Sequence, residues 1–441
     1  MADKLLVRMF NVGLGDFIYC LIPGAHKGGG DFHIVVDCGS LSGEGYLKDA
    51  VPLLKDMLPL ENGKRRLDLL VVTHQHKDHM AGFGLPLWDD VSIKAIWLSA
   101  AMEPGNPQAE RATKLHALAG QAVAQAEALA LGPAFDELFG AYAANNDDAV
   151  QSLTKTFPKA NDITPTYVTA GQSTDGDLAL PLIDAVFHIL GPEKDIDKWY
   201  LGRPQTSAIS QLVSLSDANL LQSRVTVPLD ETELPSNISP IDFRNLKNRM
   251  LSTALAFSDA DGKLVNNTSV VLLIVWKGKR LLFVGDAEWE NKFEDGRANG
   301  SWNTIWNRQR ELLNHPVDFL KVGHHGSVNA TPWDEGVKRD KPHEPAEILD
   351  AILPKGSSAQ AIVSTERSRY KTIPQSQLLA EIGARIANAK KYASAFKSAG
   401  IKPETINRYG DFEAKSFGIA QPPRTDFENL ISRARYIDVL I

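Results

Sequence analysis

The most informative part of the sequence is a short run of metal-binding residue types after an apolar stretch. Residues 67–73 have the composition of a buried strand, and the residues that follow include His74, His76, Asp78 and His79. In an extended backbone alternate side chains point the same way, so His74, His76 and Asp78 share one side, with His79 beside them. Three imidazoles and a carboxylate desolvate and repel one another unless a cation binds them. The run therefore predicts a metal site at a strand end.

Two later segments end strands in the same way. The apolar run 319–322 leads into His324 and His325 at a glycine turn, and the run 280–284 leads into Asp286. Five of the chain's eleven histidines lie in the two histidine motifs, which favours one shared site over scattered surface residues. A carboxylate has two oxygens, so Asp286 is well placed to bridge two cations.

The elements that must position these residues follow from apolar spacing and turn residues. The first hundred residues predict a helix at 46–58 and strands at 5–10, 17–22, 32–38, 67–73 and 93–98. From about residue 104 the alanine-rich composition predicts a helix, and Asn106 and Pro107 are residue types that suit its start. A second helical stretch runs to about 150.

Segments with the composition of strands occur again after residue 150. We predict strands at 165–169, 184–190, 269–276, 280–284, 319–322 and 360–364. Helices are expected at 240–257, around Trp302, and over 376–399. This pattern favours two packed sheets with helices outside, into which 101–262 is inserted.

Composition narrows the class of protein. The chain has 441 residues and a formal net charge of −7, which argues against coating nucleic acid by electrostatics alone. Two cysteines, Cys20 and Cys38, exclude a disulfide framework and favour a reduced, cytoplasmic setting. We expect no membrane span. Other histidines, such as His116 and His188, are expected to be structural.

The motifs resemble a known family. His74-x-His76-x-Asp78-His79 resembles the signature of the metallo-β-lactamase fold, and the closer resemblance is to the hydrolase domain of the competence protein ComEC. Four further motifs carry that likeness: Asn11-Val12-Gly13-Leu14-Gly15-Asp16, Val36-Asp37-Cys38-Gly39, Asn266-Asn267-Thr268-Ser269 and Lys321-Val322-Gly323-His324-His325-Gly326-Ser327. The resemblance covers about 5–100 and 265–385.

This resemblance implies an α/β (α+β) fold, a four-layer αββα sandwich with a long, mainly helical insertion. Residues 1–100 and 263–400 would form the discontinuous core. Residues 101–262 would be the insertion, with some framework strands. Residues 401–441 would be a C-terminal tail packed on the core.

The resemblance also implies residue roles. His74 and His76 would hold one metal ion, and Asp286 would bridge to a second held by Asp78, His79 and one histidine of the pair His324 and His325. The sequence does not decide which of the pair is the ligand; the other would face the substrate and protonate a leaving group. The catalytic set is Asp78, His325 and Asp286, and the residues that surround the ligands are Asp16, Asp37, Asn267 and Ser327.

Two departures from the family pattern matter. Many relatives supply a third histidine to the first metal near 265–270, where this chain has Asn267-Thr268-Ser269. The loop after the strand 360–364 lacks the family's histidine and instead carries Arg367, Arg369 and Lys371. Guanidinium groups grip phosphate oxygens in pairs, so this loop favours a phosphate-bearing substrate, DNA or RNA among them.

The sequence therefore predicts a metal-dependent hydrolase with two divalent ions, Zn²⁺ or Mn²⁺. The leading hypothesis is a phosphodiesterase or nuclease that uses a metal-bridging hydroxide. One alternative is hydrolysis of a small ester, a cyclic nucleotide or a lactone. Another is a non-catalytic scaffold that binds a protein partner through 101–262. The substrate, the native metal and the oligomeric state stay open.

Overall fold

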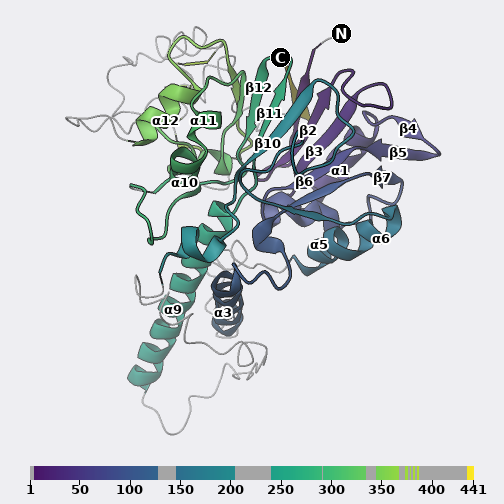
Figure 1. The fold of residues 1–441 in the computed structure, drawn as a ribbon. Coiled ribbons are helices and arrows are strands. Elements are labelled where there is room, and N and C mark those ends of the chain that lie inside the picture. Colours follow the sequence, from purple (N-terminus) through teal and green to yellow (C-terminus); the bar gives the residue numbers. More distant parts are fainter. Residues whose placement is uncertain are drawn as a thin grey trace, which may run out of the picture.

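The computed structural model is of the mixed α/β class (Figure 1). It describes residues 4–127, 146–203, 240–290, 292–333, 344–366, 373–375 and 435–441, together with 378, 381, 382, 385 and 386. The side chains of residues 125–127, 240, 242–244 and 246–254 are not among the described parts.

Seven strands form the first sheet, in the order β15-β1-β2-β3-β6-β8-β9. β3, β6, β8 and β9 pair with one another in parallel. The pairs β15-β1, β1-β2 and β2-β3 are antiparallel. Their bounds are β1 (Leu6–Phe10), β2 (Phe17–Ile22), β3 (Phe32–Cys38), β6 (Leu69–Val72), β8 (Ile96–Ser99), β9 (Thr166–Val168) and β15 (Tyr436–Leu440).

Five strands form the second sheet, in the order β10-β11-β12-β13-β14. The last three are parallel, and β10, β11 and β12 pair antiparallel. Their bounds are β10 (Ala185–Gly191), β11 (Val271–Trp276), β12 (Lys279–Phe283), β13 (Phe319–Lys321) and β14 (Gln360–Ile362). A small third sheet joins β4 (Leu60–Glu61), β5 (Lys64–Leu67) and β7 (Val91–Ile93).

The alternation of side chains along the strands explains how the two large sheets pack. Leu69 and Val71 of β6 lie in one apolar core with Leu272 and Ile274 of β11. The alternate residues Leu70 and Val72 of β6, and Leu273 of β11, lie in the two other apolar cores, on the opposite faces of their sheets. Because strand side chains alternate with a period of two, each sheet presents one face to its partner and one face to helices.

Helices cover both outer faces (Figure 1). In α1 the buried residues Leu47, Ala50, Val51 and Leu54 follow helical spacing and face the first sheet. The same layer contains α1 (Glu44–Lys55), α2 (Lys77–Met80), α5 (Asp147–Gln151) and α6 (Phe157–Asn161). The second sheet is covered by α10 (Ser301–Arg308), α11 (Arg310–Leu313) and α12 (Glu344–Ile352).

Two long helices project away from the sheets, side by side (Figure 1). They are α3 (Glu110–Glu127) and α9 (Pro240–Asn267). Leu115 of α3 and Leu264 of α9 share a separate apolar core with Trp199, which lies in a π-helical turn at Asp197–Leu201. We call this pair of helices the arm; its α9 leads directly into β11.

Most predicted elements are confirmed, and several differ. The strands predicted at 17–22 and 32–38 match β2 and β3 residue for residue. Residues 152–161, expected to begin a strand-like region, are helical, because Leu153 and Phe157 are four apart and pack under the first sheet. The helix predicted at 240–257 runs ten residues further. The strands β4, β5 and β15 were not predicted, and the strand predicted at 93–98 is divided between β7 and β8. The helix expected over 376–399 lies mostly outside the described residues.

Candidate metal centre

The predicted ligands meet where strands of both sheets end. His74 and His76 follow β6, Asp286 follows β12 and His325 follows β13. β6 is parallel to β3, and β12 is parallel to β13, so their carboxyl ends lie at one edge of each sheet. The two edges face each other because the sheets share a core. Carboxyl ends of parallel strands are the usual place for sites in such folds.

One group of ligand atoms joins two histidines and an aspartate. His74 Nε2 lies 3.1 Å from His76 Nδ1 and 3.8 Å from Asp286 Oδ2. The ligand atoms of all three side chains lie within 4.8 Å of one another. Two imidazole nitrogens and a carboxylate oxygen at such separations can coordinate one cation.

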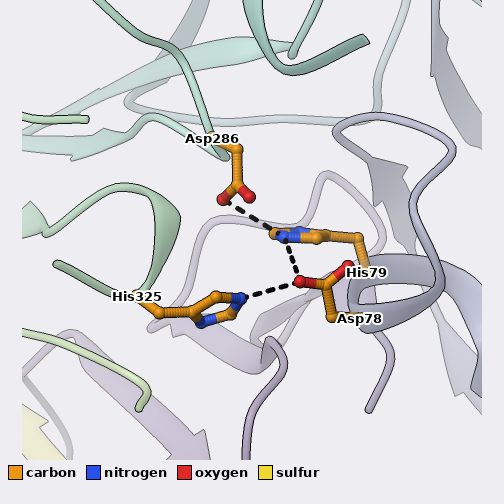
Figure 2. A group of neighbouring side chains, drawn as sticks. All are labelled: Asp78, His79, Asp286 and His325. Atoms are coloured by element: carbon orange, nitrogen blue, oxygen red, sulfur yellow. Dashed lines mark hydrogen bonds and ion pairs between the residues drawn. The ribbon is translucent and has the colours of Figure 1, made fainter. Parts of the chain in front are cut away.

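A second group shares the same aspartate (Figure 2). His79 Nε2 lies 3.1 Å from Asp286 Oδ1 and 4.0 Å from Asp78 Oδ2. His325 Nε2 lies 2.9 Å from that same Asp78 oxygen. All four side chains are buried. Asp286 therefore presents one oxygen to each group, as a bridging ligand would.

Three of the four rings in these groups are held through their other nitrogen. His79 Nδ1 lies 2.8 Å from Asp37 Oδ2 and His325 Nδ1 lies 2.8 Å from the carbonyl oxygen of Ser364. His74 Nδ1 lies 3.2 Å from Ser269 Oγ. When Nδ1 donates its hydrogen to these oxygens, the Nε2 lone pair is left facing the centre. Such outer contacts fix the ring and the tautomer that bind a metal.

Backbone geometry brings Asp286 to this position. Gly285 has φ of +53°, a left-handed conformation that side chains disfavour. A Cβ on Gly285 would lie 2.9 Å from the Cβ atoms of both Ser269 and Thr73. Only glycine fits so closely between the two sheets. The Ser269 hydroxyl also accepts a hydrogen bond from the Asp286 backbone N–H, at 3.1 Å.

The structure separates the two adjacent histidines. His325 joins the group with Asp78, whereas His324 turns toward Glu288, with 3.3 Å between His324 Nδ1 and Glu288 Oε1. Nε2 of His324 lies 3.8 Å from Asp286 Oδ2, and about a quarter of the side chain is exposed (26%). Burial opposes charge on this ring, but Asp286 and Glu288 outweigh it and raise the pKa of His324 to about 9. His324 is thus a cationic donor at the edge of the centre.

Glu288 is a functional candidate that the sequence did not indicate. The side chain is buried, and its carboxylate accepts hydrogen bonds from Asn266 Nδ2 at 2.9 Å and Asn329 Nδ2 at 2.7 Å. Its position two residues after Asp286 was the available signal. It anchors His324 to α9 and to the loop after β13.

Lys321 and Asp16 form a buried ion pair beneath the ligands. The Lys321 ammonium contacts the Asp16 carboxylate and lies 3.5 Å from the carbonyl oxygen of Gly285. Asp16 Oδ2 is 3.7 Å from His79 Nδ1. Burial opposes charge on Lys321, but the Asp16 and Asp286 carboxylates raise its pKa. Lys321 therefore stays cationic, and the sequence motif alone gave it no role.

The remaining predicted residues divide into three sets. Asp37 lies against the ligands, bonded to His79, and accepts hydrogen bonds from the Thr73 backbone and hydroxyl. Ser327 contacts His324 Nδ1 at 3.0 Å. Asn267 does not touch a ligand; its Oδ1 accepts from the Ser301 backbone instead. The three basic residues that were expected to bind phosphate lie outside the described part of the chain: Arg367, Arg369 and Lys371.

Electrostatics favour the ligand forms of these side chains. Burial lowers the pKa of His74 and His76, which favours their neutral rings. Burial opposes charge on Asp78 and Asp286, but nearby imidazoles, His79 first, outweigh it and hold both carboxyl pKa values well below their usual range. The surrounding carboxylates raise the pKa of His79, so binding a cation there would release a proton.

Unpaired atoms show that the centre fits a metal ion. Asp286 Oδ2 is buried and has no hydrogen-bond partner, and His79 Nε2 is buried with only an ion-pair contact, 3.1 Å from Asp286 Oδ1. An unsatisfied buried polar group costs about 1–3 kcal/mol. Both atoms belong to the ligand groups described above, so coordination would remove this cost. The buried histidine and aspartate cluster could therefore hold metal, and its nitrogen and oxygen donors suit zinc or manganese.

The chain matches no known family model and no curated protein sequence. Among the helices that the structure describes, none has the length and apolar composition needed to span a bilayer.

Proposed function

We propose that this protein is a dinuclear metal-dependent hydrolase of the metallo-β-lactamase fold, in the branch that resembles the ComEC hydrolase domain, and that it cleaves phosphodiesters. The observation that carries the proposal is the shared Asp286, which offers Oδ2 to the His74 and His76 group and Oδ1 to the Asp78, His79 and His325 group. Two sheets with one core, and helices on both outer faces, support the fold assignment.

The charge of the centre supports two divalent ions. Its five buried carboxylates, Asp16, Asp37, Asp78, Asp286 and Glu288, outnumber its two cationic side chains, Lys321 and His324, by three. Burying uncompensated charge is costly, and two divalent cations with one hydroxide would balance this excess. One divalent cation would leave one negative charge without a partner.

The chain's residues have distinct tasks in this proposal. Two bound divalent cations would activate water and polarise a phosphoryl oxygen. The low pKa values of Asp78 and Asp286 keep both carboxylates ionised, so they can hold the cations and accept a hydrogen bond from the attacking water. His324, cationic and partly exposed, donates a proton or hydrogen bond toward the leaving oxygen. His325 is assigned to the ligand set by its contact with Asp78.

The choice of a phosphodiester rests on the three basic residues of the 367–371 loop and on His324. An anionic substrate needs cationic donors beyond the metal ligands, and both features supply them. A lactone would need neither.

Metal analysis followed by assay tests the proposal. Protein purified without added metal is analysed for bound elements, titrated with zinc and manganese, and assayed on DNA, RNA and bis-p-nitrophenyl phosphate. We expect two ions per chain and turnover, both lost in Asp286→Ala and retained in the surface control Asp90→Ala. Absence of metal uptake would overturn the centre. Metal binding with turnover of only a lactone or phosphomonoester would reject the phosphodiester substrate.

A further inference from the structure

The arm reaches the metal-binding loop through one histidine. His116 of α3 lies within 3.5 Å of the Gln75 side chain, measured from His116 Nδ1 to Gln75 Nε2. Gln75 stands between the two ligands His74 and His76. Asn146, which precedes α5, donates to the Gln75 carbonyl oxygen at 2.8 Å. The segment between the two ligands therefore contacts 101–262 on two sides.

An aspartate of α9 fixes the ring of His116. His116 Nδ1 lies 2.8 Å from Asp261 Oδ2, so this nitrogen donates its hydrogen to the carboxylate. The Asp261 side chain is 9% exposed and that of His116 is 35% exposed. Among the described residues, His116 Nε2 has no hydrogen-bond partner, so this nitrogen can bind a ligand. A second oxygen, Asp261 Oδ1, is buried without a partner.

Packing of the arm does not require this pair. Leu115 and Leu264 already join α3 and α9 in an apolar core. A partly buried ion pair adds little stability because desolvation offsets its attraction. The pair instead lies where α9 approaches the ligands. One turn further along, Asn266 holds Glu288, and Ser269 then contacts His74.

We propose that His116 is a substrate-binding residue of the metal centre, supplied by the arm, and that Asp261 positions it. Its Nε2–H donates to an anionic phosphoryl oxygen of the substrate. This inference rests on the proposed function and deepens it, because it assigns the arm to substrate recognition.

The charge state of the ring agrees with this role. Burial opposes a charge on His116, but the hydrogen bond to Asp261, and then the charges of Asp261 and Asp147, raise its pKa. An imidazolium offers an N–H at both nitrogens, one for Asp261 and one for the substrate. Hydrogen bonds of charged groups are the strong ones, so losing this contact should be measurable.

Kinetics of three variants test the proposal on bis-p-nitrophenyl phosphate. For His116→Gln we expect KM to rise about tenfold to a hundredfold, with kcat within about twofold and two metal ions still bound. Asp261→Asn should raise KM in the same direction. Since Asp261 acts through His116, the double variant should be no worse than His116→Gln. The control is His188→Gln, a partly exposed histidine on β10, which should leave KM unchanged.

Binding of inorganic phosphate to the metal-loaded protein, measured by calorimetry, separates this inference from the proposed function. Weaker phosphate binding in His116→Gln supports it even if no phosphodiester is turned over. Unchanged KM and phosphate affinity in His116→Gln would overturn it, as would additive effects in the double variant. Parallel losses of metal, kcat and thermal stability would show a purely structural pair. If the wild type binds neither metal nor phosphate, the proposed function and this inference fail together.

Discussion

At the scale of single residues, the centre is prepared by the partners of its imidazoles. Asp37, Ser269 and the Ser364 carbonyl each hold one Nδ1, so that Nε2 faces inward. The ligand types and their spacing could be predicted from the sequence, because His-x-His-x-Asp-His is a local motif. The sequence could not indicate Ser364, Glu288 or the roles of His324 and His325. Those depend on where distant strand ends meet.

Removing Asp78 should abolish turnover while the fold persists. Asp78→Ala takes away a ligand of the second group and the partner of His325, in the first turn of α2 rather than in an apolar core. Loss of residues that only support a ligand already costs about tenfold to a hundredfold, so we expect a loss greater than about a hundredfold. Steady-state kinetics and circular dichroism measure the two effects. Near-native turnover would place the chemistry elsewhere.

Glu288→Gln should separate the orientation of His324 from metal binding. The amide cannot accept on both sides, so Asn266, Asn329 or His324 would lose an acceptor. We expect kcat to fall about tenfold to a hundredfold with two ions still bound. Elemental analysis alongside kinetics checks this. Loss of metal in the variant would instead make Glu288 part of the ligand support.

His33 gives a prediction about pH and stability. Burial, followed by the Arg66 charge, lowers the pKa of His33 to about 4, and Tyr19 Oη lies 2.7 Å from its Nδ1. Between the ordinary value of about 6.5 and 4, the unfolded chain binds the extra proton, so the free energy of unfolding falls as pH falls. Below pH 4 this contribution is constant.

The matched variant is His33→Gln, which has no such proton. By linkage, wild type should lose up to about 3 kcal/mol relative to the variant on going from pH 7 to pH 4. Urea denaturation at both pH values measures it. A stability difference that does not change with pH would contradict the prediction.

At the scale of elements, apolar runs predicted the central strands because both faces of those strands are buried. β2, β3, β12 and β13 were recognisable for this reason. The strand β15 was not, because its burial pattern is largely exposed and its pairing partner, β1, lies at the other end of the sequence. The length of α9 was underestimated, since Gly262 and several polar residues interrupt the apolar spacing of its last ten residues. These residues are helical in the structure, where Leu264 packs against α3.

The pairing of β15 with β1 depends on an ion pair. Arg8 Nε lies 2.7 Å and Arg8 Nη2 2.8 Å from the two carboxylate oxygens of Asp438, and the guanidinium lies over the Tyr436 ring at 3.5 Å. Arg8 is buried, so Asp438→Ala leaves a cation short of its partner. We expect a loss of about 1–2 kcal/mol in unfolding free energy. The exposed pair of Glu44 and Lys48 is the control: Glu44→Ala should cause no measurable change. Equal effects of both variants would mean that β15 contributes little.

At the scale of the whole molecule, a cluster of carboxylates lies where strands of the two large sheets end. Each sheet has its own helical layer, and the inner core holds the sheets together. The ligands are divided between the sheets: His74 and Asp78 come from the first, Asp286 and His325 from the second. Cations bound here would therefore join the two halves, and the carboxylate repulsion in their absence would push them apart.

Chelation should consequently destabilise the whole fold, and Asp286 should be the residue through which it does so. A site at a metal concentration a hundredfold above its dissociation constant adds about 2.7 kcal/mol to the free energy of unfolding. We expect thermal denaturation to shift down on adding EDTA and to recover with zinc or manganese. In Asp286→Ala both ligand groups lose a member, so the shift should disappear. Identical melting of loaded and chelated wild type would show that the cluster holds no metal.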